Sequence, residues 1–519
     1  MADLVSESPP PVSAPPPAAG LDRSLLRGIA WTGGAKWATQ LLGWSSTLLV
    51  ANLLGPDPYG LIGMASVFLG LVSTLTEFGL GTAIISLRKL SAEQNRQLNT
   101  IALALGVVGA LLTCAAAWPL GWIYREKQLP MIIVAMSSTF VLSALRIVPT
   151  AQLQRDLLFR RLAILETLQS VVFAIANVVF ALLGFGVGTL VIGAVVSQTV
   201  GTILTWMARP ERFAWPRRDS LGGALQFSSH VLISRLAWYL YTNADFAVAG
   251  LVFGKSVLGA YTLAWQFASI PIDKISAMIA RVTPAYFAAA QDDNRTMRGI
   301  LLNITEGLAF LTLPATFGLA LVAPEFVRLI LGPEWSGAIV PLQLLSIYAS
   351  YRSLVTVLPQ VLTVKGDTKW TMWLGVWTAI ALPIGFLVGS RFGPAGIAAA
   401  WIVVYPIFTV PLYRRSFAAI ELRRDPYLRV LWPSLRGALA MAAAVLAARI
   451  LLPESMSNVW RTVALVAIGV VVYGAVTVYP QLGRMKRLLA SVRGSGAVPR
   501  PMRRRSPRRR RARRRRDVG

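Results

Sequence analysis

The chain has 519 residues, of which 55% are hydrophobic and only 14% are charged, with a net charge of +28. A soluble domain carries roughly 25% charged residues, so this composition excludes an ordinary soluble protein. The apolar runs are continuous rather than alternating, which excludes a β-barrel and predicts an all-α polytopic membrane protein. The single cysteine, Cys114, excludes an intrachain disulfide, and His230, the only histidine, leaves no transition-metal cluster.

Residues 1–24 are rich in Pro and Ala and predict a disordered tail without a cleavable signal sequence. About fourteen apolar segments long enough to cross a bilayer as helices follow. They lie at 28–53, 59–86, 98–122, 130–150, 162–184, 186–207, 226–253, 257–280, 299–323, 338–362, 370–391, 395–413, 431–452 and 459–479.

The loops between these segments differ sharply in charge. One alternate set of loops carries 20 Lys and Arg residues and the other carries 5. The positive-inside rule places the first set, and both termini, in the cytoplasm. We therefore expect a multi-pass protein of the bacterial inner membrane.

An internal repeat accompanies this pattern. Leu53-Leu54-Gly55 with Gly60 recurs 199 residues later as Val252-Phe253-Gly254 with Gly259. An even number of spans per repeat predicts two parallel halves related by an axis along the membrane normal. The predicted units are a six-helix bundle at 25–207, a cytoplasmic linker at 208–225, a second six-helix bundle at 226–414, and spans 13 and 14 with their preceding basic loop at 415–480.

The seventh predicted span carries a polar stripe. Ser228, Arg235, Tyr239 and Thr242 fall within an arc of about 60° on a helix, and polar groups at membrane depth usually face a bundle interior or a wet cavity. The repeat offset relates Lys36 to Arg235 and Gln40 to Tyr239. This relation predicts two cations on opposite walls of a central cleft; the alternative is that Lys36 snorkels to the interface.

Further ionisable residues fall in or near the spans. Those close to helix ends are expected at the interface: Glu77, Arg146, Glu166, Asp273 and Lys274. Glu306 and Arg352 lie deeper, as a structural ion pair or as cavity residues. Asp245 is a candidate proton or coupling-ion site, a partner of a further cation, or a helix-end residue.

The final segment, 481–519, is rich in arginine and cannot build a core, so it is expected to be disordered. Anionic lipid attracts each such charge by about 1 kcal/mol, which favours the membrane surface as the partner of this tail. RNA is the alternative on charge alone, but the sequence offers no folded module that would bind a specific nucleic acid.

Four sequence pieces resemble one known family. They are Ala51-Asn52-Leu53-Leu54-Gly55-Pro56 through Gly60; Glu77-Phe78-Gly79-Leu80-Gly81 through Ile85; Pro149 with Gln152-Leu153-Gln154-Arg155-Asp156 and Phe159; and Asn243-Ala244-Asp245 with Leu258-Gly259 and Tyr261. From about Leu25 to Arg415 the chain resembles the Wzx-type oligosaccharide flippases of the polysaccharide transporter family, in the multidrug/oligosaccharidyl-lipid/polysaccharide superfamily.

The resemblance implies two six-helix bundles that alternate access around a cleft. It implies a flippase, not an enzyme, that moves undecaprenyl-pyrophosphate-linked oligosaccharide for lipopolysaccharide, capsule or exopolysaccharide assembly, with the polysaccharide polymerase machinery as an expected partner. Lys36 and Arg235 would bind the pyrophosphate. Sugar contacts would come from Gln40, Trp37, Trp238, Tyr239 and Tyr241. No cofactor is expected, and Asp245 or Glu306 would couple a proton or sodium ion.

Three other functions compete with this interpretation. A lipid II flippase of the same superfamily would also show about fourteen spans and a cationic cleft. A multidrug antiporter would favour an acidic or aromatic cavity, against the pair Lys36 and Arg235. A membrane glycosyltransferase or ligase would generally need a large loop or an exposed acidic catalytic group, and the predicted non-cytoplasmic loops are short.

Overall fold

The computed structural model describes residues 40–86, 90–156, 158–216, 218–453 and 455–479. The predicted tails at 1–24 and 481–519, and the predicted site residues Lys36 and Trp37, lie outside these residues. All regular elements of the described residues are helical. After the helix Gln40–Leu54, the first half contains α2 (Pro56–Glu77), α3 (Leu80–Ser86), α4 (Ala92–Tyr124), α5 (Leu129–Arg155), α6 (Phe159–Leu182) and α7 (Val187–Ala208).

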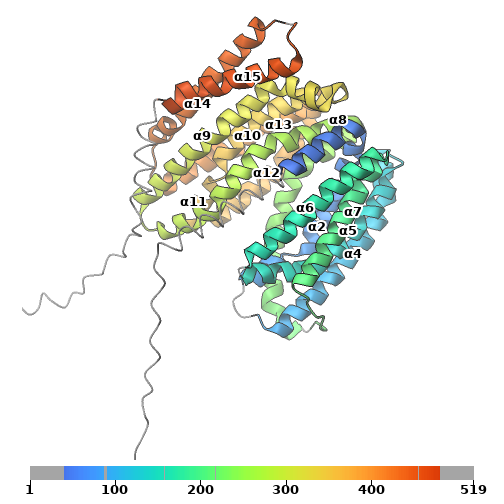
Figure 1. Ribbon diagram of the computed structural model, residues 1–519. Coiled ribbons are helices and arrows are strands. Elements are labelled where there is room, and N and C mark those ends of the chain that lie inside the picture. Colours follow the sequence, from blue (N-terminus) through green and yellow to red (C-terminus); the bar gives the residue numbers. More distant parts are fainter. Residues whose placement is uncertain (1–39, 87–89, 157, 217, 454, 480–519) are drawn as a thin grey trace, which may run out of the picture.

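The second half begins with α8 (Arg218–Ala289), whose start lies within the predicted linker at 208–225. It continues through α9 (Asn294–Phe326), η1 (Val327–Leu331), η2 (Pro333–Ala338), α10 (Ile339–Val355), α11 (Leu358–Val364), α12 (Thr368–Ser390), α13 (Gly393–Ala419), α14 (Arg424–Leu451), α15 (Asn458–Tyr473) and η3 (Gly474–Val478). Figure 1 shows α2 and α4–α7 gathered in one group and α9–α15 in another.

Within the described residues, 12 helical segments are long and apolar enough to cross a membrane, so the prediction of a polytopic all-α membrane protein is confirmed. The predicted count of fourteen is not confirmed. The described part begins at Gln40, inside the first predicted span, and Gln40–Leu54 is a shorter apolar helix. The seventh and eighth predicted spans belong to one long element, α8, whose helical backbone is interrupted at Gly254.

The sequence repeat at Gly55 and Gly254 is also a repeat of backbone conformation. Gly55 has φ 70° and ψ −176°, and Gly254 has φ 77° and ψ −170°. This region of φ and ψ is essentially restricted to glycine, since a Cβ atom would be strained there. The same sharp turn therefore ends the helix Gln40–Leu54 and divides α8.

The two repeated turns contact each other directly. The hydroxyl of Ser256 donates a hydrogen bond to Oδ1 of Asp57, and these two residues are themselves 199 positions apart. Beside them, Nζ of Lys255 lies 3.2 Å from Oε2 of Glu126 and 3.9 Å from Oδ2 of Asp57. At this end of the molecule, polar contacts thus join α2, the turn after α4 and the centre of α8.

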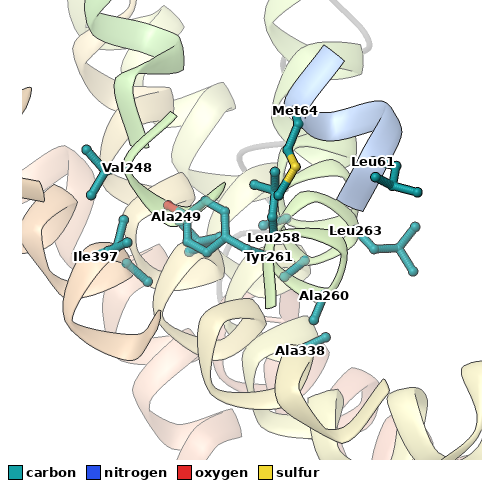
Figure 2. Close-up of a cluster of buried hydrophobic side chains, with 14 of the residues drawn as sticks. Leu61, Met64, Val248, Ala249, Leu258, Ala260, Tyr261, Leu263, Ala338 and Ile397 are labelled. Atoms are coloured by element: carbon teal, nitrogen blue, oxygen red, sulfur yellow. The ribbon is translucent and has the colours of Figure 1, made fainter. Parts of the chain in front are cut away.

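A buried apolar cluster lies next to these turns (Figure 2). Its labelled members come from α2, α8, η2 and α13: Leu61, Met64, Val248, Ala249, Leu258, Ala260, Tyr261, Leu263, Ala338 and Ile397. Lipid tails are as apolar as leucine, so close packing rather than burial from water holds such helices together. Small residues such as Ala249 and Ala260 allow the close approach.

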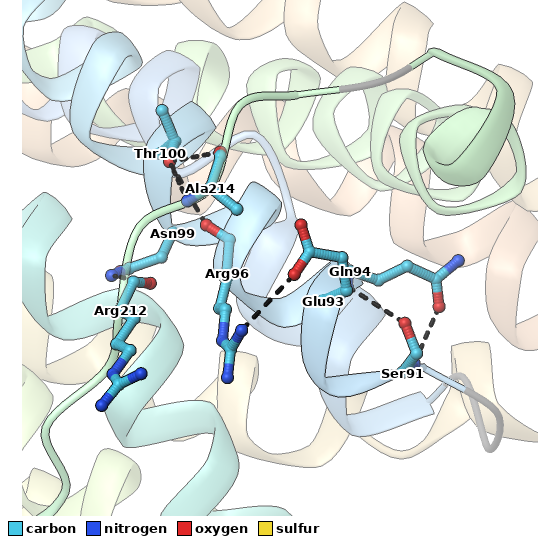
Figure 3. Close-up of polar contacts among 8 residues, drawn as sticks. All are labelled: Ser91, Glu93, Gln94, Arg96, Asn99, Thr100, Arg212 and Ala214. Carbon is cyan, nitrogen blue, oxygen red and sulfur yellow. Dashed lines mark hydrogen bonds and ion pairs between the residues drawn. The ribbon is translucent and has the colours of Figure 1, made fainter.

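The segment before α8 is fastened to the start of α4 (Figure 3). Ser91 and Gln94 form a capping box at the α4 N-terminus. The Thr100 hydroxyl donates to the carbonyl of Ala214 at 2.8 Å and accepts from its N–H at 3.2 Å. These bonds fix the entry of the chain into α8, the helix that carries Arg235.

Candidate functional site

Arg235 pairs with Glu77. Its Nη1 lies 3.0 Å from Oε2 of Glu77, and its Nη2 donates a 3.2 Å hydrogen bond to Oγ1 of Thr82. The two charged side chains are 46% and 50% exposed. An ion pair this open contributes only about 0–1 kcal/mol to stability, so a ligand can replace either partner at small cost.

A break between α2 and α3 sets the position of Glu77. Helix α2 ends at Glu77, Phe78 and Gly79 adopt left-handed φ angles of 44° and 63°, and α3 begins at Leu80. Gly79 takes this angle without steric cost, whereas Phe78 does not. The break therefore presents a carboxylate and interrupts the backbone hydrogen bonds within an apolar segment.

Arg235 and Glu77 line a pocket of about 480 Å³ where α2, α3, α5, α7 and α8 meet. This volume is typical of a small-molecule site, but most of the lining side chains are polar. Hydroxyl, amide and charged groups together suit a ligand with many hydroxyls and an anionic group. The lining residues are Glu77, Gly79, Gly81, Thr82, Ile85, Ser143, Arg146, Ile147, Thr150, Ala151, Gln154, Gln198 and Arg235.

Arg146 brings a second guanidinium to the pocket, from α5. Its Nη1 donates a 3.3 Å hydrogen bond to Oε1 of Gln198 on α7. The same oxygen accepts a 3.1 Å hydrogen bond from Nε2 of Gln169 on α6. The neutral amide of Gln198, itself bonded to Gln169, thus holds this arginine, whereas a carboxylate holds Arg235.

The predicted sugar-contact residues on α8 do not line this pocket. Trp238 is 55% exposed. The Tyr239 hydroxyl donates to the backbone carbonyls of Ser66 and Val67 on α2, at 3.1 and 2.9 Å. Tyr241 packs against the apolar cluster of Figure 2. In this conformation, Tyr239 joins α8 to α2 and is not presented to the pocket.

The first predicted span contributes little that can be described. Gln40 opens the helix Gln40–Leu54 and is half-buried. Farther along this helix, the Ser46 hydroxyl donates a 3.0 Å hydrogen bond to the carbonyl of Ala174 on α6. The relation of Lys36 to Arg235 stays a prediction.

Asp245 is completely buried inside α8, so it is not a helix-end residue. Its Oδ2 accepts hydrogen bonds from the Tyr261 hydroxyl at 2.8 Å and from Nε1 of Trp401 at 3.0 Å. Its Oδ1 accepts from the N–H of Phe246 at 3.0 Å. In the described part of the chain no cation pairs with this carboxylate, so neutral donors alone surround it within an aromatic cluster that includes Trp265.

Glu306 and Arg352, the two ionisable residues predicted to lie deeper in the spans, are on different helices. Glu306 is half-buried on α9. Arg352 on α10 lies 3.9 Å from Oδ1 of Asp273 and 5.8 Å from the ring centre of Trp265. Asp273 on α8 therefore contacts a cation on another helix.

The interfacial assignment of Glu77 and Arg146 missed their place in the pocket. Arg146 lies nine residues before Arg155, a depth of roughly 13 Å along a helix, which places it as far from the basic loop as Lys36 is from Arg27. Gly79 and Gly81 directly after Glu77 signal a helix break. Both signals are visible in the sequence.

Comparisons with known proteins agree with this architecture. The sequence profile of a family described as polysaccharide biosynthesis protein matches residues 49–340. The chain is 26% identical to the lipopolysaccharide biosynthesis protein WzxC of Escherichia coli K12, over 73% of this chain and 79% of WzxC. It is 24% identical to the succinoglycan biosynthesis transport protein ExoT of Rhizobium meliloti, over 91% of this chain and 96% of ExoT.

Among solved structures, the lipid II flippase MurJ in an inward closed conformation superposes with a TM-score of 0.72 at 13% identity, covering 88% of this chain and all of MurJ. At this identity the likeness shows a shared fold. The family profile covers more than half of the chain, and it confirms the resemblance found in the sequence motifs. The chain belongs to the polysaccharide biosynthesis protein family, the Wzx-type transporters.

Proposed function

We propose that this protein is a flippase that moves a lipid-linked oligosaccharide across the bacterial cytoplasmic membrane for polysaccharide biosynthesis. The family supplies the biosynthetic context, and the name of ExoT describes a transport protein. The observation that carries the proposal is the open polar pocket at Arg235 and Glu77, which lies among helices long enough to span a membrane. Polar groups at that depth serve polar cargo or a permeation path.

The chemistry of the pocket matches a sugar that bears an anionic carrier. Thr82, Ser143 and Gln154 supply hydroxyl and amide groups for sugar hydroxyls. Arg235 supplies a planar guanidinium that binds phosphate oxygens in a bidentate manner. We propose that the carrier is undecaprenyl pyrophosphate, that Arg235 and Lys36 bind its diphosphate, and that its lipid chain stays in the bilayer beside the protein.

The proposed architecture has fourteen spans, in two six-helix bundles plus two C-terminal helices, with both termini in the cytoplasm. Support comes from the matched turns at Gly55 and Gly254, which are six predicted spans apart. If the basic loops face the cytoplasm, as the positive-inside rule requires, these turns lie on the non-cytoplasmic side of the membrane and the pocket lies in its cytoplasmic half.

Alternating access then requires the contact between the turns to open. The bond from Ser256 to Asp57 and the pair of Lys255 with Glu126 join helices from both halves at the non-cytoplasmic end. A substrate that enters the pocket from the cytoplasm leaves after these contacts separate. The two states are populated according to how strongly each binds the substrate.

Asp245 is the proposed coupling site for a proton or a sodium ion. Its buried carboxylate accepts one bond from Tyr261, which lies on α8 beyond the break at Gly254, and one from Trp401 on α13. A change of charge at Asp245 alters the balance of these bonds and so the packing of α8 against α13. Glu306 is the second candidate for this role.

The test is reconstitution of the purified protein into liposomes with a fluorescent undecaprenyl-pyrophosphate oligosaccharide. We expect the labelled sugar to reach the opposite leaflet faster than in protein-free liposomes. A preparation that flips lipid II but no lipid-linked oligosaccharide would replace this function with that of a peptidoglycan-precursor flippase.

A further inference from the structure

Three charged side chains line the pocket, and the two arginines among them differ in their contact partners. The guanidinium of Arg235 contacts Oε2 of Glu77 at 3.0 Å and Oγ1 of Thr82 at 3.2 Å. Arg146 is held at 3.3 Å by the amide oxygen of Gln198. No carboxylate of the described residues lies within ion-pair distance of Arg146; Glu166 acts on it only through longer-range attraction. Arg146 is therefore the cation of the pocket whose charge is not neutralised by direct contact.

The surrounding helices hold Arg146 in place. On α7, the hydroxyl of Thr202 donates to the carbonyl of Leu142 at 3.0 Å, and Nε1 of Trp206 donates to the carbonyl of Leu145 at 2.8 Å. These bonds fix α7 against the turn of α5 that carries Arg146. The position and orientation of its guanidinium thus follow from helix packing, as a preorganised binding group requires.

Gly201 makes room for this arrangement. A Cβ atom at Gly201 would lie 2.7 Å from Nη1 of Arg146 and 2.7 Å from Oε1 of Gln169. A larger residue would displace the guanidinium from the amides that orient it. A half-buried arginine inside an apolar span is costly, so a retained and packed one indicates a use for its charge.

We propose that Arg146, oriented by Gln198 and Gln169, is a second anion-binding subsite of the pocket, and that Glu77 is an internal counter-ion that a bound anion displaces from Arg235. The inference rests on the proposed flippase function and extends it to the chemistry of the cargo. The ligand group is an anionic oxygen group, either the diphosphate of the carrier or the carboxylate of an acidic sugar. Both are planar or tetrahedral oxyanions that guanidinium groups bind through charge-assisted hydrogen bonds.

The two parts of the proposal predict opposite changes in affinity. Arg146→Gln removes a charge that binds the ligand, so the dissociation constant rises about tenfold. Arg146→Lys keeps the positive charge but lacks the planar guanidinium with its paired donors, so its dissociation constant lies between those of wild type and Arg146→Gln. Glu77→Gln removes the competing carboxylate, and binding becomes about threefold tighter. The matched control is Arg161→Gln, an exposed arginine at the start of α6 that loses the same charge outside the pocket.

The experiment measures binding of inorganic pyrophosphate and of glucuronate to full-length protein in lipid nanodiscs, with thermal unfolding as the check on folding. Dependence of pyrophosphate binding on Arg146 assigns the subsite to the diphosphate, and dependence of glucuronate binding alone assigns it to an acidic sugar. Equal affinity of Arg146→Gln and Arg161→Gln for both probes would overturn the subsite. Unchanged affinity of Glu77→Gln would overturn the counter-ion role.

Binding in nanodiscs and transport in proteoliposomes are measured on the same purified protein, so their failures are distinct. If wild-type protein flips the lipid-linked oligosaccharide but Arg146 affects neither probe, the subsite is wrong and the function stands. If wild-type protein binds neither probe and flips nothing, the proposed function is wrong as well.

Discussion

Gly60 and Gly259, which are 199 residues apart, occupy reciprocal positions at the contact of the two repeated turns. A Cβ atom on Gly60 would lie 1.8 Å from the carbonyl oxygen of Lys255, and a Cβ atom on Gly259 would lie 1.9 Å from the carbonyl oxygen of Pro56. Each glycine thus permits the backbone of the other turn to approach. Helices α2 and α8 meet here without space for any side chain.

Replacing Gly60 with alanine tests this contact. The added methyl group would overlap backbone that cannot move aside as a flexible side chain does, so we expect a loss of about 1–3 kcal/mol of stability. Equilibrium unfolding in mild detergent measures the change. Gly375→Ala is the matched control, since nothing lies within 4 Å of its Cβ position and alanine is the better helix former. Equal stability of both variants would contradict the close contact.

The contact between Asp57 and Ser256 offers a way to hold the two turns together. Their side chains are hydrogen-bonded, so Asp57→Cys and Ser256→Cys in a Cys114→Ser background should cross-link on oxidation. If the turns must separate for substrate release, the oxidised protein loses transport and reductant restores it. Transport at the unlinked rate by fully cross-linked protein would exclude opening at this end. Each single-cysteine variant serves as a control.

Asp245→Asn is expected to separate folding from ion coupling. Asparagine keeps the shape of aspartate and one carbonyl oxygen for Tyr261 or Trp401, but it cannot take up a proton or carry a charge. We expect folded protein whose transport no longer responds to a proton or sodium gradient. The measurement compares flipping rates with and without each gradient. A gradient response equal to that of wild type would assign coupling elsewhere, with Glu306 as the next candidate.

The orientation in the membrane is open to a labelling test. In a Cys114→Ser background, Lys127→Cys lies after α4 and Ser91→Cys lies before it, in loops assigned to opposite sides by the charge bias. A membrane-impermeant maleimide should label position 127 in intact cells and position 91 only after permeabilisation. The reverse pattern would invert the proposed topology.

Much of the fold follows from the sequence because apolar length and loop charge are local properties. The glycine repeat coincides with a shared backbone conformation, since Gly55 and Gly254 have matching positive φ angles, while the two parallel halves stay a prediction. The contact between these turns did not follow, because a repeat gives no distance between its copies. The boundary of α8 at Arg218 was missed because its first two turns carry Ser and Gly rather than a continuous apolar run.

The site was predictable only in part. Arg235 was identified from its depth in an apolar segment, and it lines the pocket. The interfacial assignment of Glu77 rests on its nearness to a helix end and leaves aside the break that Gly79 and Gly81 signal directly after it. Tyr239 shares a helical stripe with Arg235, yet its hydroxyl bonds to α2. Periodicity places residues on one face of a helix but does not say what that face meets along its length.

The flipping rate of a labelled lipid-linked oligosaccharide in proteoliposomes, compared among wild type, Arg235→Ala, Lys36→Ala and the double variant, tests the central claim most directly. We predict that Arg235→Ala lowers the rate by about tenfold or more, since a charge-assisted contact to the cargo is lost. Arg161→Ala, outside the pocket, should retain the wild-type rate. Wild-type rates in Arg235→Ala, Lys36→Ala and the double variant, with folded protein confirmed, would contradict the assignment of these cations to the transported anion.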